Sequence, residues 1–194
     1  MARIASTTAP EEALIPERHP KAPAVGSRIA SHFGHCFGCG ELHPTGLHLV
    51  AYAGQGLDIT AEFTVTENHQ GAPGLAHGGL LSLAFDEALG KLMWLLRAPA
   101  VTGRLETDFL KPVPIGTTLH ISAHITGQLG RKVYTEAIGR VSSPDGEIAV
   151  KAAALFIVVP MDHFLNNAPK EYLEELAKTP ELMAFVDPNF GVNP

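Results

Sequence analysis

Residues 77–96 read His77-Gly-Gly-Leu-Leu-Ser-Leu-Ala-Phe-Asp86-Glu-Ala-Leu-Gly90-Lys-Leu-Met-Trp-Leu-Leu96. The run has no wide polar face, which predicts one long helix buried inside a fold rather than lying on its surface. A carboxylate in such a helix must reach water, a partner or a functional site, because an unpaired buried charge costs several kcal/mol. Asp86 is therefore the first candidate for a functional residue.

The segments on either side of this helix alternate with the period of β-strands. Strands are predicted at 47–53 and 57–66 before it, and at 101–110, 118–126, 132–141 and 147–159 after it. Gly54-Gln55-Gly56 predicts a hairpin, and the short later turns predict antiparallel neighbours. The last strand is apolar on both faces, which favours a central place. The fold class is therefore predicted as α+β, with an antiparallel sheet wrapped around a long central helix.

The 194 residues fit one domain with appendages. Prolines and scattered charges in residues 1–30 predict a flexible N-terminal arm without a core of its own. Residues 31–160 form the predicted domain, and 161–194 a C-terminal extension with short helices, expected within 170–185. The net charge of -6 and the absence of a basic stripe argue against nucleic-acid binding. Without a signal-peptide run or a membrane-spanning segment, we expect a soluble, cytoplasmic protein.

The chain resembles the hotdog-fold acyl-CoA thioesterases of the PaaI-like branch, in particular the animal thioesterase superfamily members (THEM type). The resemblance covers roughly residues 36–159. It is carried by these ordered motifs: Cys36-Phe-Gly-Cys39-Gly with Pro44-Thr-Gly-Leu47, Gln70-Gly-Ala-Pro-Gly-Leu-Ala-His77-Gly-Gly with Asp86 and Gly90, Thr102, Lys111-Pro-Val-Pro, and Gly130-Arg-Lys132. It implies an acyl-CoA thioesterase with a role in fatty acid metabolism, in which coenzyme A is part of the substrate and no other cofactor is needed.

Thioester hydrolysis requires a polarised carbonyl and an activated nucleophile. Backbone N–H groups of Gly78 and Gly79, at the start of the helix, can bond a developing oxyanion, although glycines there also serve simply to make a tight turn. Asp86 is the candidate base or nucleophile, with a structural carboxylate as the alternative. The resemblance implies that Thr102 helps Asp86 hold the catalytic water, with an exposed threonine that simply favours a strand as the alternative. His77 either fixes the loop through a backbone hydrogen bond or acts as a general base.

Spacing predicts the assembly. Gly78 and Asp86 lie about 12 Å apart along a helix, too far to contact one thioester carbonyl. A second, antiparallel copy of the helix brings one chain's Asp86 opposite the other chain's Gly78. We therefore expect a homodimer with two composite sites, and a tetramer is left open. The resemblance implies the same dimer.

Three groups of residues are assigned to substrate binding. Asn68, His69 and Gln70 precede the helix, and one of them is expected to contact the thioester. The cations expected to meet the coenzyme A phosphates at strand ends and turns are Lys111, Arg131 and Lys132. The residues available to line an acyl slot, or simply to form core, are Phe85, Leu89, Met93 and Trp94.

A cluster of cysteines and histidines raises the question of zinc. The residues are His32, His35, Cys36, Cys39 and His43, and four such groups suffice for a tetrahedral site. Because the Cys-x-x-Cys-Gly run recurs in the resembling family as a structural loop, the expectation is that no metal is bound. The two cysteines also do not make a disulfide framework of the kind found in secreted proteins. Glu87, four residues before Lys91, is expected to form an ion pair on a solvated edge.

Two other functions compete with hydrolysis. A non-catalytic acyl-CoA-binding module would gain nothing from a buried carboxylate near the thioester. A hotdog dehydratase or hydratase would use a paired histidine and carboxylate, and no histidine is placed on the helix or its flank in the way those families show. A serine hydrolase is disfavoured because no Gly-x-Ser-x-Gly motif occurs.

Overall fold

The computed structural model describes residues 6–167 and 169. In this part of the chain, seven antiparallel strands form one sheet in the order β1-β2-β3-β7-β8-β9-β6. Their bounds are β1 Arg28–Ile29, β2 Val50–Ala53, β3 Asp58–Thr64, β6 Ala100–Phe109, β7 Thr118–Leu129, β8 Lys132–Val141 and β9 Ile148–Val158. The remaining elements are the 3-10 turn η1 Glu67–His69, the small hairpin β4 Gln70–Ala72 and β5 Leu75–Ala76, and the helices α1 Gly78–Lys91, α2 Met93–Leu96 and α3 Asp162–Asn167.

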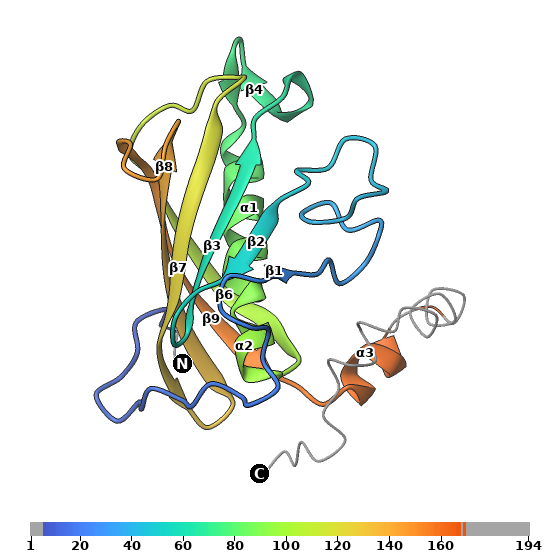
Figure 1. The fold of residues 1–194 in the computed structure, drawn as a ribbon, viewed down its shortest axis with the longest axis vertical. Coiled ribbons are helices and arrows are strands. Elements are labelled where there is room, and N and C mark those ends of the chain that lie inside the picture. Colours follow the sequence, from blue (N-terminus) through green and yellow to red (C-terminus); the bar gives the residue numbers. More distant parts are fainter. Residues whose placement is uncertain (1–5, 168, 170–194) are drawn as a thin grey trace, which may run out of the picture.

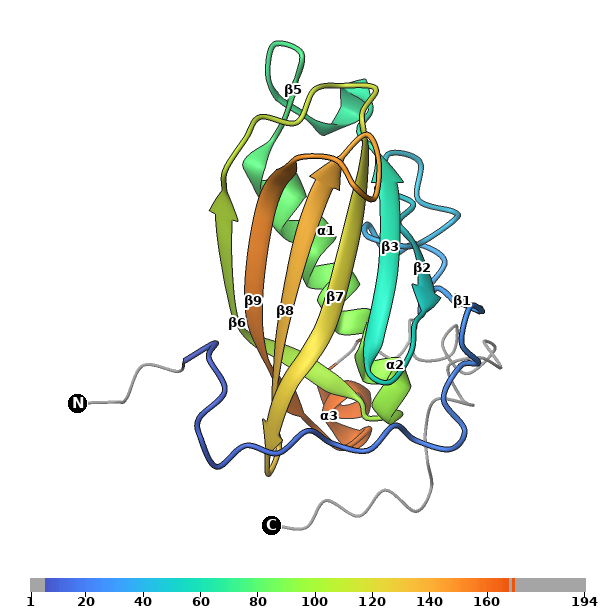
Figure 2. The same ribbon diagram turned by 60° about the vertical axis from the view of Figure 1, so that its left-hand side comes forward.

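The sheet curls around α1, which packs against β3, β6, β7, β8 and β9 (Figures 1 and 2). In β3 the residues alternate between buried and exposed, so one face contacts the helix. Phe85 on α1 is fully buried, and Gly139 on β8 leaves room for its ring, since a Cβ at Gly139 would lie 2.7 Å from the Phe85 ring. The predicted α+β arrangement of a sheet around a buried helix is confirmed.

One predicted strand neighbour is wrong. β6 does not pair with β7 but lies at the sheet edge against β9, while β7 pairs with β3 and β8. The segment 110–117 therefore carries the chain across the end of the sheet to its middle (Figure 2). A short connection fixes the direction of the next strand but not its neighbour. β9 lies inside the sheet, between β8 and β6, as its two apolar faces predict.

The predicted single helix is also wrong in one respect, because α1 ends at Lys91 and α2 follows after Leu92. The Leu92 N–H bonds to the Leu89 carbonyl at 3.2 Å, one residue short of the α-helical spacing, so the turn tightens there. Arg97 then ends α2 in the left-handed conformation, with φ of 50°. Among the helices described, none is long and apolar enough to cross a membrane.

The proline-rich N-terminal segment lies against the domain. Arg18 donates to the carbonyls of Gly54 and Gly56, at 2.8 and 2.7 Å. Near its start, the Thr7 hydroxyl donates to Glu106 on β6 at 2.8 Å, and this bond, with Arg104, holds the pKa of Glu106 below its usual range. The division into arm, domain and extension stays a prediction, and the short helices expected within 170–185 lie outside the described residues.

Candidate active site

Asp86 lies in the middle of α1 with its side chain partly exposed. The Thr102 hydroxyl on β6 donates a 2.8 Å hydrogen bond to Asp86 Oδ1. The carboxylate therefore has a fixed partner from a second element and still reaches solvent. The structure brings together these two residues, which the sequence assigned to one catalytic role.

Thr102 reaches Asp86 because β6 contains a β-bulge. Simple alternation would direct Thr102 away from the face that carries Leu105 and Phe109. The register instead shifts between Thr102 and Arg104, with Gly103 as the extra residue. Thr102 consequently stands opposite Phe156, whose buried ring faces α1 beside Gly90. The bulge therefore places Thr102 on the helix side of β6.

At the start of α1, His77 caps the helix. Its Nδ1 accepts a 2.9 Å hydrogen bond from the Gly79 N–H, and its carbonyl accepts from Leu80 and Leu81. For the Gly78 N–H, no acceptor is found among the described residues. Of the two amides expected to polarise a carbonyl, Gly79 is thus occupied by His77, whereas Gly78 is available at the positive end of the helix dipole.

A hollow of about 520 Å³ opens beside this helix start. It is lined by His77, Gly78 and Leu81 together with the end of β6 and the loop behind it, including Phe109, Lys111 and Val113. A Cβ on Gly78 would lie 3.4 Å from the Phe109 ring, so the exposed aromatic lies directly over the helix start. Phe109 is not among the site residues predicted from the sequence, where it belongs to the apolar face of a strand, and its exposure becomes visible only in the structure.

One chain does not bring the whole predicted machinery together. Asp86 and Thr102 do not line the hollow at Gly78. Because Gly78 and Asp86 both lie on the single helix α1, eight positions apart, the separation of about 12 Å expected from helix geometry applies. The two halves of the chemistry therefore lie at separate places on one protomer.

The loop before α1 mostly fixes its own shape. His69 is 2% exposed; its Nδ1 accepts from the Thr66 N–H at 3.0 Å, and its Nε2 lies 3.3 Å from the Gly46 carbonyl. Gln70 accepts from the Gly74 N–H at 2.7 Å. These contacts favour structural roles for His69 and Gln70. Asn68 is exposed.

The predicted phosphate-binding cations fall at two ends of the sheet. Lys111 lines the hollow at Gly78, where it pairs with Glu147. Arg131, whose Nε donates to the Val158 carbonyl at 2.8 Å, and Lys132 lie at the opposite end of β9. Within one protomer these three cations do not gather around one nucleotide.

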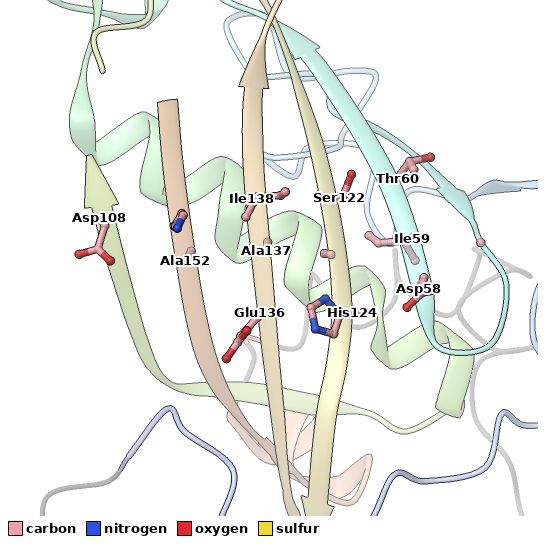
Figure 3. A pocket seen from close by; sticks show the side chains of 13 residues that line it. Asp58, Ile59, Thr60, Asp108, Ser122, His124, Glu136, Ala137, Ile138 and Ala152 are labelled. Carbon is pink, nitrogen blue, oxygen red and sulfur yellow. The ribbon is translucent and has the colours of Figure 1, made fainter. Parts of the chain in front are cut away.

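A second hollow, of about 610 Å³, lies on the sheet face opposite α1. Figure 3 shows its polar and charged side chains, among them Asp58, Asp108, His124 and Glu136, standing on the strands with α1 behind them. None of the predicted site residues lines it. The hollow at Gly78 is smaller, but it is the one that holds groups suited to polarise a carbonyl.

Comparisons with known proteins agree with this fold. Residues 73–144 match the family model described as "Thioesterase superfamily". The acyl-coenzyme A thioesterase THEM4 of Xenopus laevis is 33% identical over 88 residues, which cover 45% of this chain and 39% of that protein. The chain thus matches about two fifths of that relative's length.

Solved structures show the same architecture. A crystal structure of a thioesterase superfamily protein is 26% identical, with a TM-score of 0.58, covering 71% of this chain and 70% of that one. The E. coli PaaI protein is 18% identical with a TM-score of 0.54, covering 59% of this chain and 81% of that one. The latter likeness concerns the fold alone. The family-model match over residues 73–144 includes α1 and β6, which carry the candidate site.

Proposed function

We propose that this chain, a hotdog-fold protein of the thioesterase superfamily, hydrolyses acyl-coenzyme A thioesters to free acids and coenzyme A. The observation that carries the proposal is the hydrogen bond from Thr102 to Asp86, which holds a solvent-reachable carboxylate in a mostly apolar helix. The name of the Xenopus laevis relative supports the same substrate class. We also place the protein in the cytoplasm and in fatty acid metabolism as part of this proposal.

The chemistry divides between the two ends of the site. The Gly78 N–H bonds the thioester oxygen and stabilises the charge that develops on it. Asp86 takes a proton from water as the water oxygen bonds to the carbonyl carbon, and the carbon–sulfur bond then breaks. The proton passes to the departing thiolate. Direct attack by the Asp86 carboxylate, followed by hydrolysis of the anhydride, is the alternative use of the same residue.

A homodimer paired through β6 completes this site. β6 is the last strand of the sheet, and its outer edge has no partner strand within the described residues. Thr102 contacts Asp86 near one end of β6, and Phe109 lies over Gly78 at the other. Antiparallel pairing of two β6 strands, centred between Leu105 and Glu106, sets Thr102 opposite the partner's Phe109. Asp86 of one chain then faces Gly78 of the other, and symmetry creates two such sites.

The same pairing gathers the cations. Because the start of the partner's β6 lies beside the end of this chain's β6, the partner's Arg131 and Lys132 approach Lys111. A cluster of three cations at the mouth of the hollow suits the phosphates of coenzyme A. Association of two such dimers into a tetramer remains compatible with this site.

The test is release of free thiol from short, aromatic and long acyl-CoAs by the wild type, Asp86→Asn and Asp58→Asn. We expect turnover by the wild type and by Asp58→Asn, a matched change at an exposed position of β3. For Asp86→Asn we expect a loss of about 10²–10⁴-fold with the dimer intact. No release from any ester, combined with tight ester binding in calorimetry, would instead establish a binding module. Hydration of an enoyl-CoA without thiol release would establish the hydratase alternative.

A further inference from the structure

The loop 31–40 holds two cysteines and a histidine against α1, on the side of the helix away from β7 and β8 (Figure 1). Cys36 Sγ lies 3.4 Å from Glu87 Oε2, and Cys39 Sγ lies 3.4 Å from His32 Nδ1. His32 Nδ1 is also 3.7 Å from Glu87 Oε1. One potential ligand atom from each of these four residues lies within 4.8 Å of all the others.

Glu87 does not occupy the solvated edge that the sequence suggested. Its ion pair with Lys91 forms at 3.2 Å, but the side chains are only 11% and 2% exposed. The expectation of a solvated pair is wrong because the loop 31–40 covers this face of α1. Glu87 is thereby available to the two cysteines.

We propose that His32, Cys36, Cys39 and Glu87 bind one Zn²⁺ ion. Thiolate, imidazole and carboxylate are the groups that zinc takes in proteins, with bonds of about 2.3 Å to sulfur and about 2.0–2.2 Å to nitrogen or oxygen. A tetrahedron with such bonds separates its ligand atoms by about 3.3–3.8 Å. The separations of 3.4 Å from Cys36 Sγ to Glu87 Oε2, 3.4 Å from Cys39 Sγ to His32 Nδ1 and 3.7 Å from His32 Nδ1 to Glu87 Oε1 lie close to these values.

The surroundings are shaped for this cluster. A Cβ on Gly38 would lie 2.4 Å from Glu87 Oε2, so glycine at this position leaves room for the carboxylate where it stands. Gly40 has a similar role, since its Cβ would lie 2.5 Å from the Cys36 nitrogen. The loop is thus built to bring its cysteines and the helix carboxylate close together.

Charge balance supports the same ion. Two thiolates and one carboxylate exceed the charge of Zn²⁺ by one negative charge. The buried ammonium of Lys91 lies 3.2 Å from Cys39 Sγ and 2.9 Å from the Ala30 carbonyl, where it neutralises that excess. His32, with a side chain 45% exposed, provides the route by which the ion enters from solvent.

The proposed zinc site is structural rather than catalytic, because four protein ligands leave no open position for substrate. The ion would tie the loop 31–40 to α1 at the residue next to Asp86. It adds a site to a protein whose proposed hydrolysis requires no metal, and its test is independent of that activity.

The experiment uses the full chain, purified without a metal-binding tag. Bound zinc is measured by elemental mass spectrometry. We expect one zinc per chain, and a sulfur-to-metal charge-transfer band when Co²⁺ replaces it. Cys39→Ser and His32→Ala should lose the band. His35→Ala is the matched control and should keep it, because His35 lies in the same loop with its ring against Phe33 and outside the cluster.

Alkylation of the wild type keeps the test decisive if a variant fails to fold. Cys36 and Cys39 are the only cysteines in the sequence, so thiol labelling reports on this site alone. Added zinc should protect both thiols, and a chelator should expose them. Labelling that zinc does not change, or a Cys36–Cys39 disulfide in the purified protein without metal, would overturn the proposal. So would loss of the cobalt band in His35→Ala with retention in His32→Ala.

Discussion

Thr102 donates a hydrogen bond of 2.8 Å to Asp86 across sixteen residues of sequence, joining the edge strand β6 to the central helix α1. A bulge at Gly103 turns Thr102 toward the helix. The strand that we expect to pair with a second chain therefore also orients the carboxylate that we expect to do the chemistry. In the proposed dimer, β6 therefore contributes both to assembly and to the positioning of Asp86.

Replacing Thr102 by valine should lower kcat about tenfold to a hundredfold, because Asp86 loses a hydrogen bond to a charged group worth about 1.5–3 kcal/mol. Thr102→Ser, which keeps the hydroxyl, should stay close to the wild type. Steady-state kinetics on one acyl-CoA measures both. Equal activity of the valine and serine variants would show that the hydroxyl has no part in turnover.

Gly78→Pro should lower kcat about 10²–10³-fold, because proline removes the N–H proposed to bond the oxyanion. Proline suits the first helical position, and His77 has the extended backbone, φ -72° and ψ 131°, that proline requires before it. Gly78→Ala keeps the N–H and places its Cβ in ordinary contact, 3.4 Å from Phe109. It should retain most activity; a proline variant as active as the alanine variant would contradict this role of the amide.

Gly139→Ala should destabilise the fold by about 1–3 kcal/mol, since its Cβ would meet the buried Phe85 ring at 2.7 Å. Gly90→Ala, with 3.8 Å to Phe156 and a helical position, should be neutral or stabilising by up to about 1 kcal/mol. Urea unfolding of both variants measures the difference. Equal stabilities would mean that the sheet does not close on Phe85 as described.

Lys111→Gln should raise KM for an acyl-CoA about tenfold while leaving the same acyl-pantetheine unaffected, because only the former carries the nucleotide phosphates. Lys151→Gln, an exposed change on β9 facing the opposite hollow, should alter neither. Kinetics with the two thioesters separates phosphate binding from general damage. A rise in KM for both thioesters would mean that Lys111 acts at the reaction centre or stabilises the fold.

Much of the fold follows from local patterns that the sequence displays. Alternation in residues 57–66 and the apolar run after His77 define a strand and a helix whatever their neighbours, because burial of one face is repeated at a fixed period. These local patterns do not determine which strands become neighbours in the sheet. The eight residues between β6 and β7 permit either adjacency or a crossing of the sheet end, and packing of the whole sheet decides between them.

The positions of site residues are harder to predict where they depend on a single backbone irregularity or on a loop that is distant in the sequence. Gly103 inside a strand is a known sign of a bulge, and reading it would have turned Thr102 to the correct face. The burial of Glu87 has no such signal. It depends on the loop 31–40 folding over α1, a contact between segments about fifty residues apart.

The most direct test of the composite site mixes two inactive variants. Asp86→Asn retains Gly78, and Gly78→Pro retains Asp86, so a mixed dimer contains one intact site and one site with both defects. Random exchange of equal amounts makes half of the dimers mixed, and we predict recovery of about a quarter of wild-type thiol release. Recovery at this level would place Asp86 and Gly78 of one site on different chains. Mass spectrometry shows whether mixed dimers form. Mixed dimers that are present but inactive would contradict the shared site.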